Sequence, residues 1–250
     1  MVKLFFENSK QNKLCGILSD VNKEVVVIMC HGANSSKDSK TFLMLEKELN
    51  AKSLSTFRFD FYGHGGSEGK FEDITVSEGV DDVLNAVKLM VGKGFTRIGL
   101  VGSSFSGMVC LLAAPLVKEL FVLALKSPVC DYYDKLVWQG IYDFKKWKRQ
   151  GFVSKYLNTK KLNYSFFEDV MTLKGEGYLA AGKLRVPTII VHGDNDKTAP
   201  LTYSVKTSKL IKNCELEIIK DCGHSYFEPE HFDKMIRLIG EFIVVSAYRN

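Results

Sequence analysis

The chain has 250 residues, of which 46% are hydrophobic and 25% charged, with a formal net charge of +5 at pH 7. This composition is typical of a soluble globular protein and argues against a disordered chain. The positive charge is too small to indicate a nucleic-acid binder unless it gathers in one stripe. No apolar segment is long enough for a secretory signal or a membrane span, so we expect a cytoplasmic protein.

The chain has six cysteines, at positions 15, 30, 110, 130, 214 and 222. Their spacing lacks the paired C-x-x-C pattern of a structural zinc site. Cys30 in VVVIMC and Cys110 in GMVCLLAA lie in apolar runs, where cysteine behaves as a small hydrophobic residue. We therefore expect reduced thiols and no metal ion.

Short apolar runs alternate with stretches of helical periodicity along most of the chain. Runs at 3–7 and 13–18 flank the polar stretch NSKQNK and predict an antiparallel hairpin at one edge of a sheet. Further strands are predicted at 25–30, 54–59, 97–102, 120–126, 187–193 and 215–219, and helices at 39–52, 75–91, 106–117, 202–213 and 231–244. This alternation is typical of an α/β protein whose mostly parallel sheet has helices on both faces.

The alternation stops between residues 128 and 185. This stretch holds both tryptophans and many tyrosines and phenylalanines, and its lysines and arginines outnumber its acids. One interpretation is a surface for single-stranded nucleic acid. We favour a helical cap (lid) of residues 128–185, inserted into a core of residues 1–127 and 186–250, because basic residues alternate with acids and no RNA-binding motif is present. We expect this cap to form an apolar pocket over the site and to turn Lys145, Lys146, Lys148 and Arg149 to solvent.

Residues 100–107, LVGSSFSG, contain a candidate nucleophile. A serine is a weak nucleophile unless a base takes its proton and the chain presents it exposed. In a nucleophile elbow between a strand and a helix, the residues two before and two after the serine must be small. Ser104 meets this rule with Gly102 and Ser106, whereas the neighbouring serines each have a bulky residue at one of these positions. We predict Ser104 as nucleophile, in a turn that Ser106, in place of the usual glycine, makes slightly looser or alters without abolishing it. The alternative is a phosphate-binding loop.

An acid and a histidine follow this serine in the order that a triad needs. Open parallel sheets keep their sites at the carboxyl ends of strands, where VHGDNDKTAP (191–200) lies. We favour Asp196 over Asp194, because Asp194 is better placed to bond the backbone of its own turn. His224 lies in KDCGHSYFEPE after the last strand and is the expected base, held in its tautomer by Asp196. His192 ends a strand, and we expect it to be structural.

The oxyanion of an acyl-transfer reaction needs amide donors. The backbone N–H of Phe105, directly after the nucleophile, is the first candidate. The second is the N–H of Ala33, in the loop HGANSSKDS that follows the strand at 25–30. The alternative is that this loop is an ordinary turn between strand and helix.

These motifs together resemble the α/β-hydrolase superfamily over nearly the whole chain. HGANSSKD, FRFDFYGHGGSEGKF, VGSSFSG, VHGDNDKTAP and DCGHSYF are similar to successive motifs of microbial carboxylesterases, especially the cinnamoyl/feruloyl esterase branch. The resemblance implies an α/β-hydrolase fold, a Ser–Asp–His triad at Ser104, Asp196 and His224, and an oxyanion hole at Ala33 and Phe105. It also implies a serine carboxylesterase that acts through an acyl-enzyme, possesses a lid and uses neither metal nor organic cofactor. Ala33 and the elbow GSSFSG depart from the branch at positions where it often has Phe and GHSQGG.

The expected partner is a small-molecule ester, aryl or short-chain, with no nucleic acid and no stable membrane insertion. A monomer and a homodimer both remain open. The other functions that the sequence leaves open are a degenerate hydrolase that only binds a small molecule, and an acyltransferase or peptidase that uses the same triad. The stretch DFYGHGGSEGKF lacks the spacing of a phosphate loop, since His64 replaces its first glycine. We expect it to be structural, with Asp60 and Ser67 tying its turns.

Overall fold

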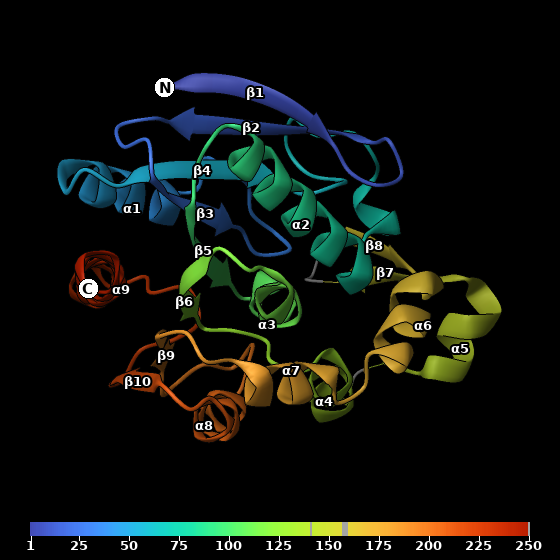
Figure 1. Ribbon diagram of the computed structural model, residues 1–250. Coiled ribbons are helices and arrows are strands. Elements are labelled where there is room, and N and C mark those ends of the chain that lie inside the picture. Colours follow the sequence, from blue (N-terminus) through green and yellow to red (C-terminus); the bar gives the residue numbers. More distant parts are fainter. Residues whose placement is uncertain (141, 157–159, 250) are drawn as a thin grey trace.

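The computed structural model describes residues 1–140, 142–156 and 160–249. An eight-stranded sheet, in the order β1-β2-β4-β3-β5-β6-β9-β10, forms the centre of the molecule (Figure 1). Its strands are β1 (Val2–Glu7), β2 (Lys13–Ser19), β3 (Val25–Cys30), β4 (Ser55–Asp60), β5 (Arg97–Ser103), β6 (Leu120–Lys126), β9 (Thr188–Gly193) and β10 (Cys214–Ile219). β2 pairs antiparallel with β1 and β4, and the other neighbours are parallel. The predicted α/β-hydrolase fold is confirmed, with strand ends within one residue of those predicted.

Helices cover both faces of the sheet. Figure 1 shows α1 (Lys40–Ala51) and α9 (Pro229–Tyr248) on one face, and α2 (Val76–Gly92), α3 (Ser106–Ala113) and α8 (Leu201–Leu210) on the other. The strand β3 explains this layering, because all six of its residues are buried. Val26 and Ile28 face the α2–α3 layer, whereas Val27 and Met29 face the α1–α9 layer. A continuous apolar run is therefore required here, rather than an alternating one.

Local capping explains where several helices begin and end. Ser39 and Thr75 precede α1 and α2, and their side-chain oxygens accept backbone N–H bonds from the first turns. α3 is shorter than predicted, because Pro115 follows it and the chain continues as a 3-10 turn over Ala114–Leu116. α9 is longer than predicted and begins at Pro229. Within the described part of the chain, no helix combines the length and the apolar character that crossing a membrane would need.

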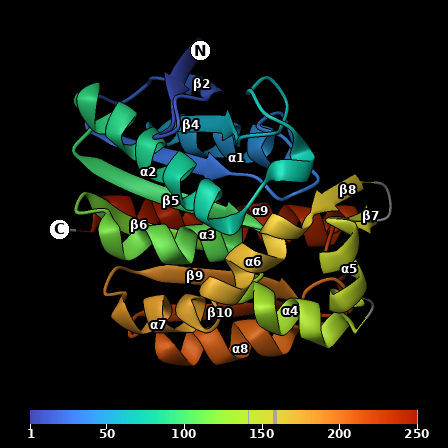
Figure 2. The ribbon, with the colours of Figure 1, turned by 90° about the vertical axis from the view of Figure 1, so that its right-hand side faces the viewer.

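The segment between β6 and β9 folds into α4 (Tyr132–Gln139), α5 (Phe144–Gln150), β7 (Phe152–Tyr156), β8 (Lys160–Asn163), α6 (Tyr164–Thr172) and α7 (Glu176–Lys183). Figure 2 shows α4, α5, β7 and β8 toward the carboxyl ends of the core strands, whereas α7 lies beside α8. The antiparallel β7–β8 pair was not predicted. Residues 141 and 157–159 of this insert, and the side chains of Trp138 and Tyr156, lie outside the described part.

Aromatic side chains of the insert pack against one another. Trp147 of α5 is fully buried, with its ring centroid 5.5 Å from that of Tyr142 and 5.8 Å from that of Phe167. Phe144 stacks on Phe167 at 4.4 Å. These rings pack between α5 and α6, and the buried Trp147 and Phe166 belong to the same apolar cluster as the residues between the sheet and α2–α3.

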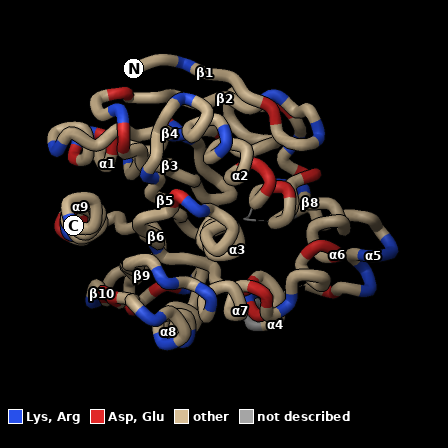
Figure 3. The backbone as a smooth tube through the Cα atoms, in the orientation of Figure 1, with Lys and Arg blue, Asp and Glu red and all other residues tan. Residues whose placement is uncertain are grey.

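The basic residues of α5 behave as expected. Lys145, Lys146, Lys148 and Arg149 are all exposed, and Figure 3 shows the basic positions of α5 in blue at the outer edge of the insert. On the opposite side, Asp169 of α6 accepts backbone N–H bonds from Val76 (2.8 Å) and Ser77 (3.0 Å), the first residues of α2. A carboxylate at a helix N-terminus is electrostatically favourable. The insert is therefore anchored to the core through the start of α2.

Candidate active site

Ser104 lies in the sharp turn between β5 and α3. Its φ of +54° is in the left-handed region, which is uncommon for a residue other than glycine. The turn is fixed by a hydrogen bond from the N–H of Ser104 to the carbonyl of Lys126 at the end of β6 (3.0 Å). A Cβ at Gly102 would lie only 2.7 Å from the carbonyl oxygen of Ser106. The small residue before the serine is thus a steric requirement, as the elbow geometry demands.

Ser106 ties the elbow with hydrogen bonds, so the turn is altered rather than loosened. Its side chain is fully buried. The hydroxyl oxygen accepts a bond from the N–H of Ser103 (2.7 Å), and the hydroxyl donates to the carbonyl oxygen of Cys30 at the end of β3. A glycine could make neither bond. The side chain therefore links the strand that ends at the elbow to the strand that leads into the Ala33 loop.

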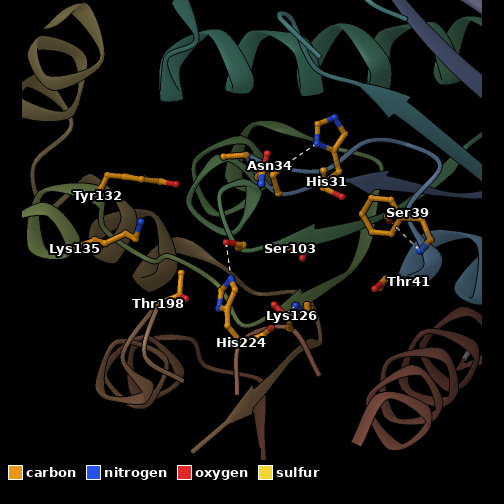
Figure 4. Close-up of a pocket in the computed structure, with 16 residues that line it drawn as sticks. His31, Asn34, Ser39, Thr41, Ser103, Lys126, Tyr132, Lys135, Thr198 and His224 are labelled. Atoms are coloured by element: carbon orange, nitrogen blue, oxygen red, sulfur yellow. Dashed lines mark hydrogen bonds between the residues drawn. The ribbon is translucent and has the colours of Figure 1, made fainter. Parts of the chain in front are cut away.

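His224 connects Ser104 to Asp196. Its Nε2 lies 2.9 Å from Ser104 Oγ, and its Nδ1 lies 2.6 Å from Asp196 Oδ2 (Figure 4). Asp196 is buried, and its other oxygen accepts the N–H groups of Thr198 (2.7 Å) and Ala199 (2.9 Å). Asp194, by contrast, is exposed. The structure thus brings together the three side chains that the sequence singled out, in the order nucleophile, base and acid.

The carboxylate of Asp196 is held ionised. Burial alone would raise its pKa, but bonds from His192 and His224 outweigh burial and hold the pKa well below its usual range. His192 Nε2 lies 3.1 Å from Asp196 Oδ2, and its Nδ1 lies 2.7 Å from the hydroxyl of Ser204 on α8. We expected His192 to be only structural. Its contact with Asp196 makes it part of the support of the candidate triad, a role that its place at a strand end did not reveal.

The environment of His224 favours its neutral form. Burial lowers the pKa of this imidazole, and the bond to Asp196 opposes the shift without cancelling it. The ammonium of Lys126 lowers the pKa further, because its Nζ donates to the carbonyl oxygen of His224 at 2.7 Å. The pKa of His224 therefore lies below that of a free histidine. The sequence alone would predict the value of a free histidine. A neutral imidazole is the form that can accept the proton of Ser104.

The loop after β3 lies directly against Ser104. A Cβ at Gly32 would come within 3.3 Å of the Cβ of Ser104, so this position suits a residue without a side chain. The next residue, Ala33, lines the cavity, and Nε2 of His64 lies 2.8 Å from its carbonyl oxygen. That contact orients the peptide group between Ala33 and Asn34, and His31 Nδ1, 2.8 Å from the carbonyl oxygen of Gly32, contacts the peptide group that carries the Ala33 N–H. Phe105 is buried and is the N-cap residue directly before α3, so its amide lies at the N-terminal end of that helix.

A cavity of about 470 Å³ opens beside Ser104, within the range usual for small-molecule sites. Figure 4 shows its lining, which comes mostly from the ends of β3, β5 and β6 and the loops of Thr198 and His224. From the described residues of the insert, only Tyr132 and Lys135 of α4 contribute. The predicted apolar pocket is wrong. Apart from Phe42 and Tyr132, the lining residues are polar, charged or small.

A family comparison agrees with this arrangement. A model described as "Alpha/beta hydrolase family" matches residues 27–238, which include the elbow, the acid and the histidine. The chain belongs to the α/β hydrolase family.

Individual relatives in this family are distant. Serine hydrolase BPHL from Homo sapiens is 24% identical over 196 residues, covering 72% of this chain and 66% of the human protein. Est1E from Butyrivibrio proteoclasticus, whose structure holds ferulic acid, has a TM-score of 0.88 at 24% identity, with 98% of this chain and all of that chain covered. The Pyrococcus furiosus esterase Pf2001 has a TM-score of 0.73 at 23% identity, covering 97% of this chain and 91% of that one. At these identities the structures demonstrate the shared hydrolase fold.

The loop DFYGHGGSEGKF is structural, as expected. The carboxylate of Asp60 accepts the N–H groups of Lys37 and Gly66 (both 2.8 Å), and the hydroxyl of Ser67 donates to the Asp60 carbonyl (2.6 Å). Among the residues that the structure describes, no group of three or more His, Cys, Asp or Glu side chains is arranged to hold a metal ion.

Proposed function

We propose that this α/β hydrolase is a serine carboxylesterase that cleaves small esters through an acyl-enzyme. The observation that carries the proposal is the hydrogen-bonded chain from Ser104 through His224 to Asp196 at the edge of a cavity. A serine, a neutral imidazole and a buried carboxylate in this order are the parts that acyl transfer needs. Short-chain acyl and aryl esters are the expected substrates.

The first half of the reaction acylates the enzyme. Ser104 Oγ attacks the ester carbonyl while His224 Nε2 takes its proton, and Asp196 stabilises the imidazolium that forms. The backbone N–H groups of Ala33 and Phe105 donate to the negative oxygen of the tetrahedral intermediate. His224 then returns the proton to the leaving alcohol. The C–O bond breaks, and the acyl group stays on Ser104.

The second half releases the acid. A water molecule takes the place of the alcohol, His224 accepts its proton, and the same amides hold the second tetrahedral intermediate. Collapse of this intermediate restores the Ser104 hydroxyl and frees the carboxylic acid. Every proton is carried by groups of the chain, so the proposed reaction requires no metal and no organic cofactor.

We propose residues 128–185 as a lid over this site, on a core of residues 1–127 and 186–250. The contact that supports this role is α4, which brings Tyr132 and Lys135 to the cavity and sets the Tyr132 ring 5.8 Å from that of Phe105. The lid would therefore act on substrate choice, while the reacting groups belong to the core.

A panel of p-nitrophenyl, aryl and glyceryl esters tests the proposal, together with a p-nitroanilide amide and labelling by a fluorophosphonate. The protein should hydrolyse at least one ester class and be labelled at Ser104, with labelling abolished in Ser104→Ala. A folded protein that takes no label and cleaves no ester would instead be a binding protein. Faster cleavage of the amide, or transfer of the acyl group to an added alcohol in place of water, would indicate a peptidase or an acyltransferase.

A further inference from the structure

Two lysines give the cavity beside Ser104 a positive charge. Lys126 and Lys135 both line it and are both buried, with 8% and 2% of their surface exposed. No Asp or Glu is among the described residues that line the cavity. Burying an ammonium group costs free energy unless an anion or other polar partners compensate. The two lysines come from different parts of the molecule, Lys126 from the core and Lys135 from the insert.

Lys126 is fixed beside the candidate triad. It is the last residue of β6 and lies opposite Ser103 of β5 in the sheet register, and its carbonyl oxygen accepts the N–H of Ser104. Its Nζ donates to the carbonyl oxygen of His224 and lies 4.8 Å from the centre of the Tyr226 ring. A carbonyl and a ring do not neutralise its charge. The ammonium of Lys126 therefore adds positive potential next to the reacting groups.

Lys135 brings a second positive charge from α4. Its Nζ lies 5.3 Å from the centre of the Tyr132 ring, and Figure 4 shows the two side chains on the same side of the cavity. Asp196 acts electrostatically on both lysines, and its own oxygens accept bonds from His224, Thr198 and Ala199. Burial lowers the pKa of each lysine to about 8, so both are still mainly charged at pH 7.

We propose that this cavity selects an ester that carries a second, anionic group, and that Lys135 binds that group while Ser104 attacks the ester carbonyl. This inference rests on the esterase function proposed above. A carboxylate is the simplest group that fits, because an ammonium donates strong charge-assisted hydrogen bonds to it. The polar lining, with Asn34, Ser35 and Thr41, suits the same charged substrate better than a long apolar chain.

A matched pair of substrates tests the charge without changing the shape. Mono-p-nitrophenyl glutarate and p-nitrophenyl 5-methylhexanoate differ only in a terminal carboxylate against an isopropyl group. A second pair, 4-acetoxybenzoate and 4-isopropylphenyl acetate, places the charge on the alcohol side. The rate measured with the Ser104→Ala protein, which reports spontaneous hydrolysis, is subtracted from each rate. We expect the acidic member of at least one pair to have a kcat/KM roughly tenfold or more above that of its neutral partner.

Lys135→Met should lower this acidic-to-neutral ratio roughly tenfold, and Lys135→Arg, which keeps the charge, should restore part of it. The control is Lys146→Met, which removes the same charge from the exposed face of α5 and should leave the ratio as in the unmodified protein. Thermal melting establishes that each variant is folded.

The outcomes separate this inference from the proposed function. If no ester of either pair and none of the panel above is cleaved, the esterase proposal fails and this inference falls with it, whereas cleavage of panel esters but of neither pair overturns this inference alone. If the neutral esters are cleaved as fast as the acidic ones, the esterase stands and the anionic selectivity is wrong, even if no lysine variant folds. An acidic preference that survives in Lys135→Met would overturn the role of that residue.

Discussion

The core and the insert bury their apolar residues in different ways. In the core, strand β3 is buried along its whole length between two helical layers, and many aliphatic residues share the packing. In the insert, α5 buries only Trp147 among seven residues, and β8 buries only Leu162. The stability of the core is thus spread over many contacts, whereas that of the part of the insert around α5 and β8 depends on a few large rings.

The same division applies to the chemistry that we propose. Ser104, His224 and Asp196 all follow core strands, where parallel pairing brings their loops to one edge of the sheet. The insert adds Tyr132 and Lys135 to the cavity. Changes in the core should therefore affect the rate of every substrate, and changes in the insert should affect stability and substrate choice.

The largest effect is expected for Ser104→Ala. Ester hydrolysis should fall by roughly 10³-fold or more, because the members of a triad act as a unit. The change is measured as kcat on p-nitrophenyl acetate, with circular dichroism as a check on folding. Ser103→Ala is the matched control and should retain most of the activity. The elbow assignment would be wrong if the control lost activity as completely while Ser104→Ala did not.

Trp147→Ala tests the dependence of the insert on single rings. Truncating a fully buried tryptophan costs about 3–5 kcal/mol, which urea unfolding would measure. Trp147→Phe should cost much less, since the ring remains and the buried Nε1, which has no hydrogen-bond partner among the described residues, is removed.

The contrast with the core appears in activity. Below the unfolding transition, Trp147→Ala should still hydrolyse p-nitrophenyl acetate, because the reacting groups belong to core loops. A folded variant that had lost this activity would show that the insert takes part in the chemistry, and the division between the two regions would fail.

The sequence predicted the core better than the insert for a physical reason. Strands such as 25–30 and 120–126 are buried on both faces, so their sequences must be continuous apolar runs. The β7–β8 pair has no such requirement, because it is short and half exposed, and its pattern was missed. The polar character of the cavity was also missed. The insert's aromatic residues suggested an apolar pocket, but which of them face each other depends on how α5 and α6 pack.

Site residues that lie in local motifs could be selected from the sequence. The residues that hold them in place through hydrogen bonds and charge could not. Ser104 is selected by small neighbours in the chain, and Asp196 and His224 by their place after strands. His192 and Lys126 act through contacts across strands and loops that no local pattern encodes. Ser106 was recognised only as a departure from glycine, since its bond to Cys30 joins residues 76 positions apart.

Ser106→Ala is expected to have an intermediate effect. It leaves the N–H of Ser103 without its buried acceptor, which costs about 1–3 kcal/mol of unfolding free energy. Because the hydroxyl also bonds Cys30 ahead of the Ala33 loop, kcat should fall several-fold with little change in KM. Ser77→Ala, at an exposed position in the first turn of α2, is the control and should change neither quantity. Unchanged stability and kcat in Ser106→Ala would mean that the bridge is dispensable.

The smallest effect, and the one that isolates a single charge, is a shift in the pH dependence. His224 must be neutral to accept a proton, so activity is present above its pKa and is lost as the pH falls through it. Burial and the Lys126 ammonium both lower that pKa, whereas the bond to Asp196 raises it. Activity on a neutral ester should therefore persist to a lower pH than a free histidine would allow.

Lys126→Met keeps the site buried but removes the charge, so the pKa of His224 should rise and the acidic limb of log kcat/KM against pH should move to higher pH. Lys197→Met, at an exposed position next to Asp196, is the charge-matched control and should leave the limb in place. A limb that stays put or moves to lower pH in Lys126→Met would show that this lysine does not set the protonation of the base.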